Sequence, residues 1–173
     1  DVVMGTLGKA LGSYGAYVCA SRELTEYLLN AARSFVFSTA PPPPVVAASL
    51  AALELLESHP ERVERLVANA TTLRSALAAE GLAVGGSGTQ IVPVEIGDAA
   101  RTMELSERIL ERGVFAQGIR PPTVPEGTSR LRFTVMSTHR AGELEHAAKL
   151  VGTAAHELGL SEATESRAPL AVA

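Results

Sequence analysis

The chain lacks several features that would restrict its partners or its setting. Its 173 residues include no tryptophan, and its one cysteine, Cys19, cannot form a disulfide within the chain, which favours a reducing, cytoplasmic environment. The net charge is −4, with no block of like charges, so the sequence gives no support for a nucleic-acid or membrane-surface partner. Every apolar run is broken well before the ~18 residues that a bilayer-spanning helix needs. We therefore expect neither nucleic acid nor membrane as a partner.

Aromatic residues and lysines are also scarce. Aromatics make up 4% of the chain against 46% for all hydrophobic residues, so aliphatic side chains must fill most of the core. Lys9 and Lys149 stand against thirteen arginines. The length suits one domain or parts of two. Because the chain begins at Asp1 and enters a strand-like run at once, we interpret it as part of a longer protein whose earlier part is absent.

Turn residues divide the chain into short apolar segments and longer segments with helical spacing. The predicted strands are residues 1–4, 16–20, 35–37, 91–96, 114–117 and 130–136. The predicted helices are 22–32 with Ser21 as N-cap, 45–58 after a run of prolines, a helix reaching to about 80, 99–112 and 140–158. His59-Pro60 predicts a boundary between two structural units, and residues 161–173 are predicted to form a disordered tail. Alternating strands and helices indicate an α/β or α+β fold.

Lys9 is the strongest candidate for covalent chemistry. An amine can lose its proton and form a Schiff base, whereas a guanidinium in a protein cannot. Lys9 lies in a glycine-rich turn that superficially resembles a phosphate-binding P-loop, but that motif needs Gly and Ser or Thr where this chain has Val3 and Ala10. The residues alone leave open the alternative that Lys9 is an ordinary surface lysine.

A second candidate site lies on the strand predicted at residues 130–136. Its period of two places Arg130, Arg132 and Thr134 on one face and apolar residues on the other. Arginines on such a face are often simply solvated. The functional alternative is that one guanidinium binds a carboxylate through two hydrogen bonds, with Arg120 and Thr123 adding a polar wall. No His spacing typical of a metal site is present, so we expect no metal.

Two stretches together resemble a known family. They are Gly-Thr-Leu-Gly-Lys-Ala-Leu-Gly-Ser at residues 5–13 and Gly-Ile-Arg-Pro-Pro-Thr-Val-Pro-Glu-Gly-Thr-Ser-Arg-Leu-Arg at 118–132. Over residues 1 to about 158 the chain resembles the C-terminal part of the α-oxoamine synthases, which depend on pyridoxal 5'-phosphate (PLP), and its Ile-Arg-Pro-Pro run is closest to the biotin-pathway branch. The resemblance implies an α/β fold of the PLP-dependent transferase fold type I. Residues 1–58 would end the large PLP-binding domain, and 59–160 would form the small C-terminal α+β domain.

The resemblance also implies roles for individual residues. Lys9 would hold the cofactor as its internal aldimine and later transfer a proton, while Thr6 would bind the cofactor phosphate from the same subunit. Ser38 and Thr39 match a segment that reaches the phosphate across a dimer interface, so a homodimer with its active site at the interface is expected. The implied substrate residues are Thr123, which contacts substrate, Arg132, which grips the amino-acid carboxylate, and the neighbouring Arg120.

The reaction implied by the resemblance is a decarboxylating condensation of L-alanine with a pimeloyl thioester carried by CoA or by a carrier protein. The family's ring-stacking His and the carboxylate that pairs with the pyridine nitrogen would lie before Asp1, so we expect the 173-residue piece by itself to have no useful turnover. Two alternatives stay open: another branch of the family (glycine C-acetyltransferase or 5-aminolevulinate synthase), or a non-catalytic binding or interaction domain.

Overall fold

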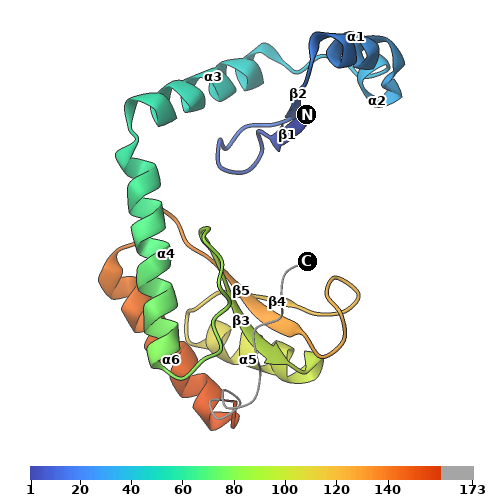
Figure 1. The fold of residues 1–173 in the computed structure, drawn as a ribbon. Coiled ribbons are helices and arrows are strands. Elements are labelled where there is room, and N and C mark those ends of the chain that lie inside the picture. The colour runs from blue at the N-terminus through green and yellow to red at the C-terminus, as the bar shows by residue number, and fades with distance from the viewer. Residues whose placement is uncertain (161–173) are drawn as a thin grey trace. The chain divides into compact units, whose positions relative to one another are not determined.

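The computed structural model describes residues 1–160, and the tail predicted at residues 161–173 lies outside the described residues (Figure 1). The chain divides into two compact units. Unit 1 is Asp1–Pro60, and unit 2 begins at Glu61. Within residues 1–160, no helix combines the length and the apolar character that crossing a membrane would require.

Unit 1 combines a two-stranded hairpin with three helices. Its strands pair in antiparallel register from Val3↔Cys19 to Thr6↔Ala16. Ser21 caps the first helix as predicted, since its side-chain oxygen accepts a hydrogen bond from the Leu24 N–H. Prolines occupy the first turn of the last helix, where a missing N–H costs nothing. The elements are β1 (Val3–Thr6), β2 (Ala16–Cys19), α1 (Arg22–Ala31), α2 (Arg33–Val36) and α3 (Pro43–Ser58).

The prediction of an extended segment at residues 35–37 is wrong. This segment falls in and just after helix α2, and the Phe37 N–H donates to the Arg33 carbonyl at 3.0 Å. Aromatic and β-branched residues favour a strand only where a partner strand is available to complete the backbone hydrogen bonds. No strand in the described residues pairs with this segment, so its backbone bonds locally instead.

Unit 2 contains a three-stranded antiparallel sheet with the strand order β3-β5-β4. Figure 1 shows α4 and α6 lying side by side, and α5 packs against all three strands. Asp98 caps α5 by accepting from the Arg101 N–H at 2.8 Å. The elements are α4 (Glu61–Ala79), β3 (Ile91–Gly97), α5 (Ala99–Glu111), β4 (Gln117–Ile119), β5 (Ser129–Thr134) and α6 (Ala141–Glu157).

Strand β4 begins three residues later than the strand predicted at 114–117. Gly113 ends α5 in a left-handed conformation, with φ +84°, which glycine adopts without steric cost. The following N–H, of Val114, still bonds back to the Ile109 carbonyl at 2.9 Å. Residues 113 and 114 therefore belong to the helix terminus, and the backbone is free to pair with β5 only from Gln117.

The core of unit 2 lies between one face of the sheet and the three helices. The predicted alternation of β5 is confirmed, because Leu131 and Phe133 are buried whereas Arg132 and Thr134 are exposed. We call the opposite face, on which the side chains of Arg132 and Thr134 are exposed in the described part of the chain, the open sheet face. Fully buried core side chains are Leu77 on α4, Val92 and Val94 on β3, Leu105 and Ile109 on α5, Leu131 on β5 and Val151 on α6.

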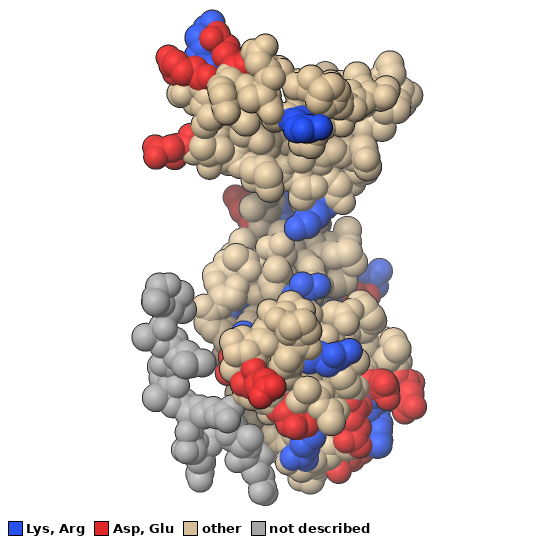
Figure 2. Space-filling view, turned by 90° about the vertical axis from the view of Figure 1, so that its right-hand side faces the viewer, with Lys and Arg blue, Asp and Glu red and all other residues tan. Residues whose placement is uncertain are grey.

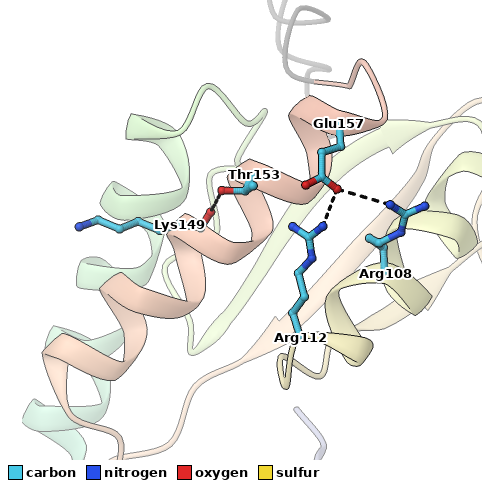
Figure 3. A network of polar contacts seen from close by, with 5 residues as sticks. All are labelled: Arg108, Arg112, Lys149, Thr153 and Glu157. Atoms are coloured by element: carbon cyan, nitrogen blue, oxygen red, sulfur yellow. Dashed lines mark hydrogen bonds and ion pairs between the residues drawn. The ribbon is translucent and has the colours of Figure 1, made fainter.

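Helix α6 is held to its neighbours in two ways. A Cβ at Gly152 would lie only 2.6 Å from the Cβ of Glu80, so glycine permits the close approach of the residue that follows α4. On the other side, Arg108 of α5 and Arg112, which follows α5, both reach the same carboxylate oxygen of Glu157 (Figure 3). Lys149 points away from this network.

Candidate active site

Lys9 lies in the loop that joins β1 to β2, which we define as the Lys9 loop, residues 7–15. The loop continues the hairpin, because the Leu7 N–H donates to the Gly15 carbonyl and the Ser13 N–H donates to the Leu7 carbonyl, each at 2.9 Å. Within the loop closed by these two hydrogen bonds, the Gly12 N–H donates to the Lys9 carbonyl at 3.0 Å and forms a turn. Gly12 has φ +59°, a conformation that favours glycine. The hairpin thus presents Lys9 at the start of a tight turn.

The Lys9 loop offers the donors that an aldehyde with a phosphate group requires. Lys9 is exposed, and no carboxylate of the described residues lies within ion-pair distance of its amine. The Thr6 hydroxyl accepts from the Gly8 N–H at 3.2 Å and donates to the Gly15 carbonyl only at a long 3.4 Å. Because that proton is weakly engaged, it can turn toward a phosphate oxygen. The residues present therefore fit PLP.

Gly5 is covered by an aromatic ring rather than left open. It pairs with Tyr17 across the hairpin, and a Cβ at position 5 would lie 2.4 Å from the tip of the Tyr17 ring. The glycine before Thr6 thus accommodates a cross-strand tyrosine.

Ser38 and Thr39 lie between α2 and the prolines that lead into α3, and both are exposed. The Ser38 hydroxyl donates to the Ser34 carbonyl. In the described part of the chain, no hydrogen bond joins either residue to the Lys9 loop. Their predicted part in holding a phosphate across a dimer interface stays a prediction.

Arg132 occupies the middle of the open sheet face. It lies on the central strand β5, opposite Pro93 of β3 and Gln117 of β4. Among residues 1–160, no hydrogen bond or ion pair engages its guanidinium. Arg130 on the same face is already engaged, since it donates to the Thr128 carbonyl at 3.0 Å and lies 3.8 Å from the Glu95 carboxylate. Of the two arginines on this face, Arg132 is the one available to bind a carboxylate.

Arg120 and Thr123 lie in the connection between β4 and β5. The Thr123 N–H donates to the Arg120 carbonyl at 3.1 Å, which closes a turn across the Pro121-Pro122 cis peptide bond. Both side chains are exposed, and the Arg120 guanidinium makes a long 3.5 Å contact to the Pro121 carbonyl. The predicted substrate residues Arg120, Thr123 and Arg132 therefore all belong to unit 2, whereas Lys9, Thr6, Ser38 and Thr39 belong to unit 1.

Sequence reasoning missed two polar anchors. Ser49, inside the apolar helix α3, makes a hydrogen bond of 2.8 Å with Ser13 of the Lys9 loop. Asn69, buried on α4, donates to the carbonyls of Met136 at 3.0 Å and His139 at 2.8 Å and so pins the turn that follows β5. Both residues interrupt apolar helical stretches, and that interruption was the available signal. Groups of three or more residues suited to hold a metal do not occur in residues 1–160.

Comparison with known proteins defines the class first. The model of the aminotransferase class I and II family matches residues 1–151, so the chain belongs to this family. A solved structure of serine palmitoyltransferase (SPT) with a PLP internal aldimine is 28% identical, with a TM-score of 0.86 over 92% of this chain and 41% of that chain. The predicted PLP-dependent transferase fold is confirmed by this similarity.

The particular resemblance is to 8-amino-7-oxononanoate synthase. The enzyme of that name from Citrifermentans bemidjiense is 52% identical over 162 residues, which are 92% of this chain and 42% of the relative. The crystal structure of the Francisella tularensis 8-amino-7-oxononanoate synthase is 26% identical, with a TM-score of 0.79 over 91% of this chain and 46% of that chain. The resemblance predicted from the sequence is thus confirmed. The chain spans less than half the length of the curated relatives it matches.

Proposed function

We propose that this chain is the cofactor-lysine and carboxylate-binding part of an 8-amino-7-oxononanoate synthase. The whole enzyme condenses L-alanine with pimeloyl-CoA or a pimeloyl carrier protein and releases CO2 and the free thiol. The observation that carries the proposal is the exposed, unpaired amine of Lys9 on its hairpin loop, in a chain 52% identical to an enzyme of that name. Two curated relatives with that name are each 52% identical, which favours the biotin-pathway branch.

Unit 1 would hold the cofactor. Lys9 would bind the PLP aldehyde through Nζ, and the Thr6 hydroxyl would donate to the phosphate. Ser38 and Thr39 would add hydroxyl donors from the partner subunit of a homodimer. Bound PLP supplies a ring that accepts the electron pair left when the substrate Cα loses its proton.

Proton transfer and substrate orientation would fall to two side chains. The amine of Lys9, once free, accepts the Cα proton of alanine as a general base. The Arg132 guanidinium would bind the alanine carboxylate through two charge-assisted hydrogen bonds, while Arg130 lies 3.8 Å from the Glu95 carboxylate. Thr123 contacts the substrate, and Arg120 adds positive charge beside it. Cα would then attack the pimeloyl thioester carbonyl and expel the thiol, and the carboxylate held by Arg132 would leave as CO2, with a proton returned to Cα before the product is released.

The proposal also covers the domain organisation of the protein and its location in the cell. Residues 1–58 would end the large PLP-binding domain, and residues 59–160 would form the small C-terminal domain. We place the protein in the cytoplasm, because the one cysteine of this chain, Cys19, is exposed and free.

Replacement of Lys9 tests the proposal. Lys9→Arg keeps the positive charge but cannot form a Schiff base, so 8-amino-7-oxononanoate formation by the complete polypeptide should fall by about 10²–10⁴-fold or more. Lys149→Arg is the matched control and should leave the rate unchanged, because Lys149 lies exposed on α6. The same assay with glycine in place of alanine separates the related synthases. A Lys9→Arg enzyme with normal turnover would refute the proposal.

A further inference from the structure

Two serine hydroxyls join the Lys9 loop to helix α3. The Ser13 hydroxyl donates to the Val45 carbonyl at 2.9 Å, and Ser49 lies 2.8 Å from the Ser13 hydroxyl oxygen and 3.0 Å from the same carbonyl. Val45 lies in the first turn of α3, and Ser49 lies one turn further on. Positions 36 residues apart in sequence therefore share one hydrogen-bonded cluster.

The protons of this cluster can be assigned. A serine hydroxyl has one proton to donate and two lone pairs to accept. Ser13 uses its proton on the Val45 carbonyl, which leaves its oxygen free to accept from Ser49. Ser49 also lies 3.0 Å from the Val45 carbonyl, four residues earlier in its own helix, so its proton has two acceptors. We call the loop seated when the Ser13 hydroxyl donates to the Val45 carbonyl, and only the seated loop satisfies Ser13 in this way.

The position of Ser49 indicates that its hydroxyl serves the loop in addition to bonding within the helix. Ser49 is the one buried residue of unit 1, with 8% of its surface exposed, and it sits among alanines, valines and leucines. A serine inside a helix is less favourable than alanine, because its hydroxyl competes for backbone carbonyls. Ser58 near the end of α3 also bonds to a carbonyl four residues earlier, that of Glu54 at 2.6 Å, but it contacts no loop.

The Lys9 loop needs an anchor of this kind. Only two backbone hydrogen bonds, Leu7 N–H to Gly15 and Ser13 N–H to Leu7, close the loop around the Lys9 turn, so the loop opens more readily when Ser13 is not also held to α3. Ser13 lies four residues after Lys9 and one residue after Gly12, within the same ring of hydrogen bonds. Fixing Ser13 to α3 therefore fixes the base of the turn that presents the amine.

We propose that Ser49, acting through Ser13, is a positioning residue that seats the Lys9 loop on the first turn of α3 and so pre-organises Lys9 for the cofactor. The role in cofactor binding rests on the function proposed above, whereas the seating of the loop does not. A loop that is seated only part of the time binds PLP more weakly by the fraction of time for which it is seated.

The test uses Ser49→Ala, Ser13→Ala, the double variant and the control Ser58→Ala in the complete polypeptide. Hydrogen exchange at the Leu7 and Ser13 amides reports the seating, and titration with PLP followed by absorbance reports its affinity. Ser49→Ala should speed exchange and weaken PLP binding by about the same factor, roughly twofold to twelvefold, as expected for one neutral hydrogen bond. Ser58→Ala should change neither. The double variant should resemble the single ones, because the two hydroxyls act as a unit.

The outcomes separate the two claims. Unchanged exchange in Ser49→Ala would overturn the seating of the loop. Faster exchange with unchanged PLP affinity would overturn the positioning role. Borohydride reduction of the unaltered protein with PLP, followed by peptide mapping, tests the proposed function independently. Equal labelling of Lys9 and Lys149 would refute that function. The hydrogen-exchange results would still decide whether the loop is seated on α3. Circular dichroism of each variant verifies that α3 is intact.

Discussion

The two units keep their apolar side chains in opposite places. In unit 2 the large aliphatic residues of the sheet and helices are buried at or near 0% exposure, and charged residues are spread over the outside (Figure 2). In unit 1 the large apolar side chains face outward, as shown by Met4 at 75% and Phe37 at 78% exposed. Residues 1–60 contain eight Lys, Arg, Asp and Glu residues, against 23 in residues 61–160. Unit 2 buries a core of large apolar side chains, although Phe115 is 73% exposed, whereas unit 1 buries none of its large apolar side chains.

Helix α3 shows this difference within a single element. Val46, Leu50 and Leu53 are exposed along one side of the helix, and Leu55 is exposed on the opposite side. A helix that is apolar on all sides is normally buried in a larger protein. An apolar surface of this extent is typical of a unit that packs against further protein, which agrees with the active site at a subunit interface that we propose.

The largest effect is expected from replacing one leucine by alanine in each unit. Leu131→Ala removes a fully buried side chain from β5 and should lower the free energy of unfolding of unit 2 by about 2–5 kcal/mol, through lost burial and the cavity left behind. Leu50→Ala on α3 removes a side chain that is 57% exposed and should change stability by less than about 0.5 kcal/mol in the 173-residue chain. Native-state hydrogen exchange gives both values. Equal losses would contradict the comparison.

A smaller effect on stability is expected when one asparagine in each unit is replaced by alanine. Asn69→Ala leaves the Met136 and His139 carbonyls without their buried donor and should cost unit 2 about 1–3 kcal/mol. The matched change in unit 1 is Asn30→Ala, where an exposed amide bonds within its own helix to the Glu26 carbonyl, and it should cost less than about 0.5 kcal/mol. Urea denaturation followed by circular dichroism measures both changes. An Asn69→Ala protein as stable as the parent would mean that water replaces the lost donor.

Much of this arrangement was predictable from the sequence, because it depends on local rules. The Ser21 cap, the alternation of β5 and the glycine turn around Lys9 follow from side-chain type and spacing. The predictions of two strands were wrong for the same reason, because the pairing of strands in a sheet depends on residues distant in sequence. Residues 35–37 found no partner strand, and β4 could begin only after the helix terminus had used Gly113 and Val114.

Some polar residues of the candidate site could likewise be predicted from the sequence, whereas their tertiary contacts could not. Lys9 and Arg132 were recognisable from composition, period and resemblance. The pairing of Arg130 with Glu95, which leaves Arg132 free, depends on the register between β3 and β5. The contact of Ser13 with Ser49 likewise depends on tertiary packing, which no spacing in the sequence encodes.

The smallest effects should come from the helix caps. Asp98→Ala in unit 2 removes a 2.8 Å bond and should cost about 1 kcal/mol, whereas Ser21→Ala in unit 1 removes a longer bond of 3.4 Å and should cost about 0.5 kcal/mol. Hydrogen exchange of the first turns of α1 and α5 measures the difference. A larger loss at Ser21 than at Asp98 would show that unit 1 depends on local helix stability more than its exposed surface implies.

Ser21 also affects a titration. The pKa of Glu23 lies below its ordinary value, because its carboxylate accepts from its own backbone N–H and from the Ser21 hydroxyl. A lowered pKa stabilises the folded state above the unfolded-state pKa, and this contribution is lost as the pH falls through the folded-state value. Ser21→Ala should therefore raise the pKa of Glu23 toward its ordinary value, as followed by NMR of the carboxyl carbon. An unchanged pKa would assign the whole shift to the backbone N–H.

The contact at Gly152 has a consequence for how unit 2 tolerates change. The space there is set by a single hydrogen atom, because even a methyl group would overlap the stem of Glu80. Neighbouring positions on the outer side of α6, such as Lys149 and Thr153, face solvent and carry no such restriction. Position 152 should therefore accept only glycine, whereas positions 149 and 153, one turn before it and next to it, should accept many residues.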